Sequence, residues 1–138
     1  MANGVFTVFT RCTDPDREEE FNRWYSHTHL PDLSAAKGFT RSRRYVSVDP
    51  EQTSPIYLVL YEFESDDITA SIQDLLRIAM SEFAAGRHID CVGPVTELPS
   101  QIWQEIDPAS LKPLERLEYP TQVPETIRRR VEGILQRQ

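Results

Sequence analysis

The sequence has little of what metal-binding and secreted proteins usually require. Among its 138 residues are two cysteines and three histidines. Cys12 and Cys91 stand at no zinc-site spacing from each other or from a histidine, and we expect both to be reduced thiols. The first residues lack the basic and apolar regions of a secretory signal, and no stretch approaches about 18 consecutive apolar residues. We therefore expect a cytoplasmic protein without a membrane-spanning helix.

Several chemistries and partners are excluded in the same way. The sequence contains no glycine-rich phosphate loop, no zinc motif and no G-x-S-x-G nucleophile elbow. Its formal net charge is −7, and residues 1–100 hold 9 Lys/Arg against 16 Asp/Glu. An excess of negative charge repels the phosphate groups of nucleic acids and of anionic lipids. We expect no nucleic acid, no membrane, no metal and no cofactor.

The pattern of apolar residues predicts one domain built from alternating strands and helices. Hydrophobic residues make up 39% and charged residues 27% of the chain, which is typical of a globular protein with its own core. The predicted elements are a strand over 5–12, a helix from Pro15 to about Lys37 with a kink at Pro31, strands over 39–48 and 56–63, a helix over 68–85, and a strand over 90–98 that residues 102–106 extend or follow.

This β-α-β-β-α-β order predicts a ferredoxin-like α+β sheet with both helices on one face. The strand over 56–63 is apolar on both of its alternating faces, so the second face of the sheet needs a cover. We expect a second copy to supply it, giving a homodimer whose sheets close into an α/β barrel with an interior of small-ligand size. The domain should span residues 1–106, followed by a proline-rich arm and a C-terminal amphipathic helix over 107–138.

The densest group of reactive side chains lies on the first predicted helix. At about 100° per residue, Tyr25, His29 and Asp32 fall on one helical face. A histidine near a tyrosine and a carboxylate can hold one tautomer and transfer protons near neutral pH, so we predict these three residues to be catalytic. In the alternative interpretation, His29 only satisfies free carbonyls at the kink, and Trp24 and Tyr25 are core residues.

A second group of candidates lies on the strand over 39–48. Alternation places Arg43 and Tyr45 on one face, where they could bind a carboxylate or phenolate if that face lines the barrel. The alternative is that the arginines pair with acidic residues at the surface. Arg44 points to the opposite face, and we assign it no role.

Three further residues are predicted to bind substrate. Trp24 lies beside the catalytic candidates, and Trp103, just after the fourth strand, could stack on an aromatic ligand or simply plug the barrel. His88 stands between the second helix and the fourth strand, where an exposed loop histidine is the simpler interpretation.

One segment carries a family resemblance. Glu-Phe-Asn-Arg-Trp-Tyr-x-x-x-His-Leu-Pro-Asp-Leu, followed by Lys-Gly-Phe and by a Tyr-Leu-x-Leu-Tyr-Glu-Phe strand, resembles the EthD-like branch of the dimeric α/β-barrel superfamily over about residues 4–100. The resemblance implies an active site that includes Trp24, Tyr25 and His29. Some relatives have a histidine at the mouth of the barrel, and the resemblance implies that His88 occupies that place. It also implies chemistry of the kind that superfamily performs, including cofactor-free dehydration, cyclisation, isomerisation, decarboxylation and oxygenation of aromatic or polyketide-like molecules.

These observations lead to one leading function and two alternatives. We expect a small homodimeric, cofactor-independent enzyme of the dehydratase, cyclase or isomerase type. It would act by acid–base catalysis on a hydrophobic aromatic or carbonyl-bearing small molecule. The first alternative is a monooxygenase, either cofactor-free or haem-dependent, with His29 as the first candidate for an axial ligand. The second is a non-catalytic protein that binds a small molecule or serves in assembly.

Overall fold

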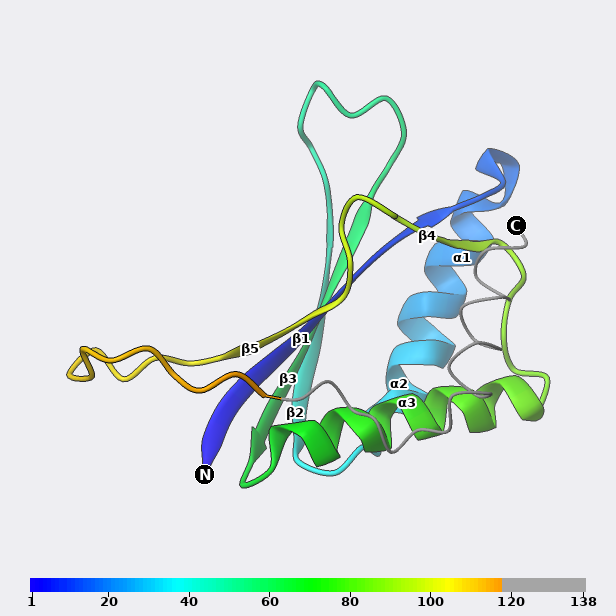
Figure 1. The fold of residues 1–138 in the computed structure, drawn as a ribbon. Helices are drawn as coiled ribbons and strands as arrows, with labels where there is room; N and C mark the ends of the chain where they lie inside the picture. The colour runs from blue at the N-terminus through cyan, green and yellow to red at the C-terminus, as the bar shows by residue number, and fades with distance from the viewer. Residues whose placement is uncertain (118–138) are drawn as a thin grey trace.

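The computed structural model describes residues 1–117 and has a mixed α+β fold, with an antiparallel five-stranded sheet and helices packed against one of its faces (Figure 1). The strands are β1 (Ala2–Cys12), β2 (Phe39–Val46), β3 (Tyr57–Ser65), β4 (Val92–Pro94) and β5 (Gln101–Gln104). The helices are a 3₁₀ turn (Pro15–Arg17), α1 (Glu18–Trp24), a π-helical turn (Tyr25–His29), α2 (Leu30–Leu33) and α3 (Ile68–Ala84). Within the described range, no helix is long and apolar enough to cross a membrane.

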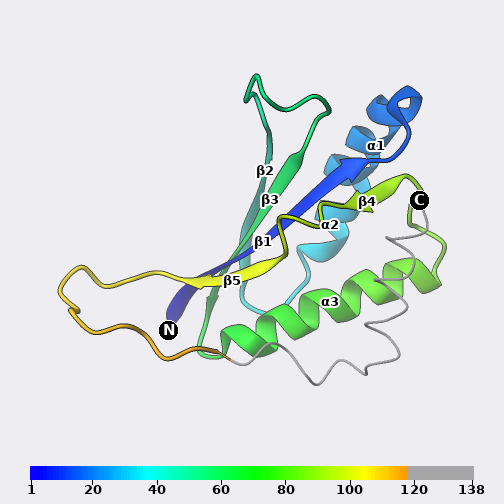
Figure 2. The same ribbon diagram turned by 45° about the horizontal axis from the view of Figure 1, so that its top comes forward.

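The strand order confirms the ferredoxin-like fold. β3 lies between β2 and β1, and both β4 and β5 pair with the other edge of β1. The long β1–β3 ladder places Phe6 opposite Tyr61 and Thr10 opposite Tyr57. Both α1 and α3 lie on the same side of this sheet, as predicted (Figures 1 and 2).

The fourth strand differs from the prediction. Instead of one strand over 90–98, the structure has two short strands, β4 beside the end of β1 and β5 beside its first half. Pro94 ends β4 because it has no backbone N–H to donate to the ladder. The chain then leaves the sheet in a turn closed by a hydrogen bond from Leu98 N–H to the Val95 carbonyl, at 3.0 Å. It returns as β5, so the predicted continuation at residues 102–106 is confirmed in position.

The first helix also differs from the prediction. It begins as expected, with the Asp14 side chain accepting a hydrogen bond from the Asp16 N–H at 3.0 Å. Just before Pro31, where a kink was expected, the helix has a π-helical turn, in which the Leu30 N–H reaches five residues back to the Tyr25 carbonyl. A proline ring clashes with the carbonyl four residues earlier, here His27, and widening the helix relieves that crowding.

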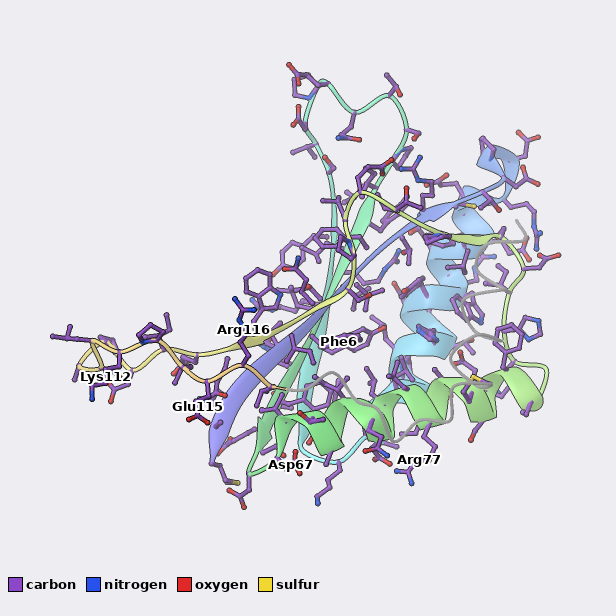
Figure 3. The ribbon with its side chains drawn as sticks, viewed as in Figure 1. Phe6, Asp67, Arg77, Lys112, Glu115 and Arg116 are labelled. Carbon is purple, nitrogen blue, oxygen red and sulfur yellow. The ribbon has the colours of Figure 1, made fainter. Side chains whose placement is uncertain are left out.

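The two faces of the sheet have different environments. On the helix-facing side, Phe6, Val59, Tyr61 and Phe63 are nearly inaccessible and belong to one core cluster with residues of α1 and α3. Figure 3 labels Phe6 on this side of the sheet. The opposite side, which we call the open face, carries partly exposed apolar residues, namely Val5, Phe9, Leu58 and Leu60, with Trp103 beside them. The apolar character of both faces of β3, noted in the sequence, is therefore a real feature of the fold.

The predicted arm follows β5. Residues 107–117 contain no helix or strand, and Lys112, Glu115 and Arg116 lie on this extended segment (Figure 3). The predicted C-terminal amphipathic helix lies outside the described residues.

Two glycines with positive φ provide a test of how tightly the chain packs where β2 begins. Gly38 has φ +76°, and an added Cβ would lie 2.9 Å from the Glu64 carbonyl oxygen and 3.0 Å from Ser71 Oγ. Gly86 has φ +70°, but an added Cβ would meet nothing within 4 Å. Alanine should cost about 1–2 kcal/mol of unfolding free energy at either site because the left-handed conformation disfavours a side chain.

Gly38→Ala should cost about 1–3 kcal/mol more than Gly86→Ala, because the added methyl group must displace backbone as well. Urea denaturation of the two variants measures this difference. Equal losses of unfolding free energy in the two variants would show that the backbone around the start of β2 can relax to accept the methyl group.

Candidate active site

The π-helical turn builds an aromatic enclosure around His29. The Trp24 ring is stacked on the His29 ring with centroids 4.6 Å apart, and the Tyr25 ring meets it edge-on at 4.9 Å. In an α-helix, residues five apart point about 140° away from each other, so Trp24 and His29 could not stack. The wider π-helical turn brings them onto one side, which regular helical spacing did not predict.

A buried carboxylate from α3 orients the His29 ring. Nδ1 of His29 lies 2.6 Å from Oε1 of Glu82, whose side chain is only 4% exposed. With a carboxylate as its partner, Nδ1 carries the hydrogen and donates it, which leaves the lone pair on Nε2. Nε2 forms no hydrogen bond to any residue in the described range. A histidine held in this way has the orientation and tautomer that a general base requires.

Glu82 was not among the residues chosen from the sequence. The apolar stripe of α3 runs through Ile68, Ile72, Leu75 and Ala79, and its next buried position is Glu82, whereas Phe83 is half-buried. An acidic residue on the buried side of an amphipathic helix was the signal that could have identified it, because such a charge needs a partner.

Asp32, the predicted carboxylate partner of His29, has a different role. Both of its oxygens accept hydrogen bonds from Arg87, at 2.9 and 3.0 Å. The Arg87 guanidinium holds the pKa of Asp32 below its usual range. Asp32 nevertheless lies close to the histidine pair, because Glu82 and His29 also lower its pKa. Arg87 also accepts a hydrogen bond on its carbonyl from Trp24 Nε1, at 2.7 Å, so this segment fixes Trp24 over the histidine.

Two buried tyrosines lie beside the histidine, between the helix and the sheet. Tyr25 is 3% exposed and Tyr61 is 2% exposed. Burial raises the pKa of Tyr25, and burial together with the neighbouring Tyr25 raises the pKa of Tyr61 well above its usual range. Both phenols therefore stay neutral at physiological pH and keep a hydrogen that they can donate.

Arg44, to which we assigned no role, lies on the helix-facing side of β2. Its Cζ atom is 4.7 Å from the centroid of the Tyr25 ring and 5.0 Å from that of Tyr57. It donates hydrogen bonds to Asn22 Oδ1 at 2.8 Å and to Ser26 Oγ at 3.0 Å. The structure thus places a cation against the tyrosine that contacts His29.

The other substrate-binding candidates are not brought together with His29. Arg43 and Tyr45 lie on the open face, where Arg43 pairs with Glu62 at 3.2 Å, as the surface-pair alternative predicted. Trp103 lies on the same face, 52% exposed, and donates from Nε1 to Thr7 Oγ1 at 2.9 Å. Because the sheet separates the two groups, they cannot line one site within a single chain.

His88 belongs to neither group. It lies in the exposed segment after α3, where its ring is stacked on Phe83 with centroids 3.8 Å apart.

In the part of the chain that the structure describes, neither a metal centre nor a reactive thiol accompanies the histidine. Residues 1–117 contain no group of three or more His, Cys, Asp or Glu side chains arranged to hold a metal ion. Cys12 and Cys91 are free thiols that lie close together. Burial, and then the neighbouring Cys12, raise the pKa of Cys91 to about 12. Cys91 is therefore a packed thiol and not a nucleophile.

Two solved structures are similar to this chain. A proposed antibiotic biosynthesis monooxygenase from Bordetella bronchiseptica is 17% identical, with 76% of this chain and 97% of that chain covered and a TM-score of 0.49. A proposed monooxygenase from Shewanella loihica PV-4 is 15% identical, with 78% and 98% covered and a TM-score of 0.45. No family model and no curated protein sequence matches the chain. Neither structure is named EthD-like, so that finer resemblance stays a prediction.

The His29–Glu82 hydrogen bond predicts the tautomer of the histidine. When the imidazole is neutral, ¹⁵N chemical shifts should show the hydrogen on Nδ1 of His29. Glu82→Leu should remove this preference, because the acceptor is gone. His27 is exposed and provides an internal reference in the same spectrum. A neutral His29 with its hydrogen on Nε2 would contradict the arrangement described above.

Proposed function

We propose that this chain is an enzyme that removes a proton from an activated C–H or O–H group of an aromatic or carbonyl-bearing small molecule, with Nε2 of His29 as the base. The observation that carries the proposal is the 2.6 Å contact between His29 Nδ1 and the buried Glu82 carboxylate. A buried structural histidine also needs a hydrogen-bond partner, so the chemical role is tested below by substitution. For a base, the carboxylate fixes the tautomer and stabilises the imidazolium that forms.

The proposed step balances without a cofactor. The substrate proton moves to Nε2 of His29, and the electron pair of the broken bond stays on the substrate as an enolate or phenolate. The neutral phenols of Tyr25 and Tyr61 are suited to donate hydrogen bonds to the developing oxyanion. Returning the proton to a different carbon gives an isomer, and giving it to a leaving hydroxyl group releases water.

The monooxygenase alternative begins with the same step. An enolate or phenolate can pass electrons to O₂, after which one oxygen atom enters the substrate and the other leaves as water with two substrate hydrogens. The two similar structures are named as proposed monooxygenases. Their likeness to this chain concerns the fold alone, so O₂ enters the proposal as a co-substrate to be measured.

Anthrone is a suitable probe because loss of one methylene proton converts it into an aromatic oxyanion. In anaerobic D₂O, the wild-type protein should exchange this methylene hydrogen for deuterium faster than buffer alone, as measured by NMR. His29→Asn should reduce the added rate about 10²–10⁴-fold, because the asparagine amide can still donate to Glu82 but is not a base.

His27→Ala is the matched control, since His27 is exposed on the same turn, and its rate should equal that of the wild type. No exchange above the buffer rate, or a rate within about threefold of wild type in folded His29→Asn, would contradict the proposal and favour a binding role. In air, O₂ uptake that parallels the exchange rate would select the monooxygenase; exchange without O₂ uptake would select the isomerase or dehydratase type.

The homodimer expected from the sequence is part of this proposal. The open face carries Leu58 and Leu60 at the centre of the sheet, with Val5 and Phe9 on the neighbouring strand. Apolar side chains in adjacent strands form a surface that a second sheet can cover. In such a dimer, Arg43, Tyr45 and Trp103 would line the contact between the copies, away from His29.

The wild-type chain should sediment as a dimer at micromolar concentration, and Leu60→Asp should shift it to the monomer because a carboxylate would be buried in the interface. Val48→Asp provides the control: Val48 is 89% exposed in the loop between β2 and β3. A wild-type monomer, or an unchanged dimer in Leu60→Asp, would exclude packing through this face.

A further inference from the structure

Arg44 carries a positive charge for which the described part of the chain supplies no negative partner. It takes part in no ion pair within residues 1–117, whereas Arg41 and Arg43 on the same strand both pair with Glu62. Its hydrogen bonds go to neutral oxygens, the Asn22 side chain, the Ser26 hydroxyl and the Asn22 carbonyl at 3.4 Å. Its Nε atom is buried and has no hydrogen-bond partner among the described residues.

The surroundings of Arg44 are aromatic rather than acidic. Its guanidinium lies over the rings of Phe21, Tyr25 and Tyr57, with 4.7–5.7 Å between Cζ and the ring centroids. Ring faces attract a cation but do not neutralise it. Glu18 is engaged elsewhere, because it accepts a hydrogen bond from the Tyr57 hydroxyl at 2.5 Å. Burial lowers the pKa of Arg44, and a guanidinium nevertheless keeps its charge at neutral pH.

The position of Arg44 connects this unpaired charge with the candidate base. Tyr25 contacts both groups, because its ring centroid lies 4.9 Å from that of His29 and 4.7 Å from Cζ of Arg44. A base that removes a proton leaves a negative charge on the substrate. A cation packed on the same tyrosine is suited to stabilise that charge.

We propose that Arg44 forms an anion subsite on the helix-facing side of the sheet and binds an oxyanion attached to an aromatic ring. The oxyanion is either the phenolate or enolate formed by proton removal, or a carboxylate that the substrate already carries. The guanidinium would supply a planar, charged donor for that oxyanion. The inference rests on the proposed function for its substrate class, and it predicts binding whether or not turnover occurs.

The test uses two probes, 4-nitrophenolate and benzoate, and measures their dissociation constants by calorimetry with the full chain. Arg44→Met should weaken binding of at least one probe about 10- to 100-fold, as expected for loss of a hydrogen bond to a charged group. Arg44→Lys should weaken it less, because the charge remains and the planar fork is lost. Arg41→Met removes a guanidinium from the other face of the same strand, and it should leave both affinities within about twofold of wild type.

The two probes distinguish the source of the oxyanion. If Arg44→Met weakens the binding of 4-nitrophenolate alone, the subsite binds the anion formed by proton removal. A loss confined to benzoate assigns it to a carboxylate on the substrate. Failure of the wild-type protein to bind either probe, or equal affinities in wild type and folded Arg44→Met, would overturn the proposal.

Two further measurements keep the test independent of protein folding and of catalysis. In the wild-type protein, binding beside a cation should lower the pKa of 4-nitrophenol, which is measured from its absorbance. An unchanged or raised pKa would overturn the proposed subsite. This measurement does not need the Arg44→Met variant to fold. His29→Asn should retain probe binding, because it leaves Arg44 in place. Loss of proton exchange with retained binding would thus separate failure of the base from failure of the subsite.

Discussion

Pro31 has no backbone hydrogen and a ring that crowds the preceding helical turn, and the geometry of the candidate site follows from this constraint. The helix accommodates it with a π-helical turn over Tyr25–His29. That turn places the Trp24 ring on His29, while Asp32 pairs with Arg87. It also leaves room for the Glu82 side chain from α3 to reach Nδ1 of His29. π-helical turns are uncommon and occur often at functional sites, which agrees with a chemical role for this segment.

The sheet divides the polar groups of the protein into two sets. On its helix-facing side lie His29, Glu82 and Arg44 with the tyrosines between them. On its open face, Glu62 accepts from both Arg41 and Arg43 at the surface. The surface pairs contribute little to stability, since exposed ion pairs are typically worth about 0–1 kcal/mol. The charges between helices and sheet are costly to bury, and a protein keeps such groups where their chemistry is used.

Glu82 and Arg44, both near Tyr25, form no ion pair with each other in the described part of the chain. Glu82 bonds to His29 through one oxygen, and its second oxygen is buried without a partner. Arg44 likewise has a buried Nε without a partner. A fold selected for stability alone would bring these charges together or replace them with apolar side chains. Tyr25 instead contacts both His29 and Arg44. In the proposed reaction, His29 takes up the proton and Arg44 stabilises the anion that remains.

The sequence alone determined the order of the elements, the ferredoxin-like fold and the apolar stripe of α3. These features depend on local patterns, namely apolar periodicity, capping residues and turn residues, which are read from neighbouring positions. It did not determine the π-helical turn, the split of the fourth strand, or the partners of His29 and Asp32. Glu82 lies 53 residues from His29, and Arg44 reaches Tyr25 from another strand. Only tertiary packing decides which side chains meet across a helix–sheet interface, because one inserted residue in a helical turn changes the direction of every side chain that follows.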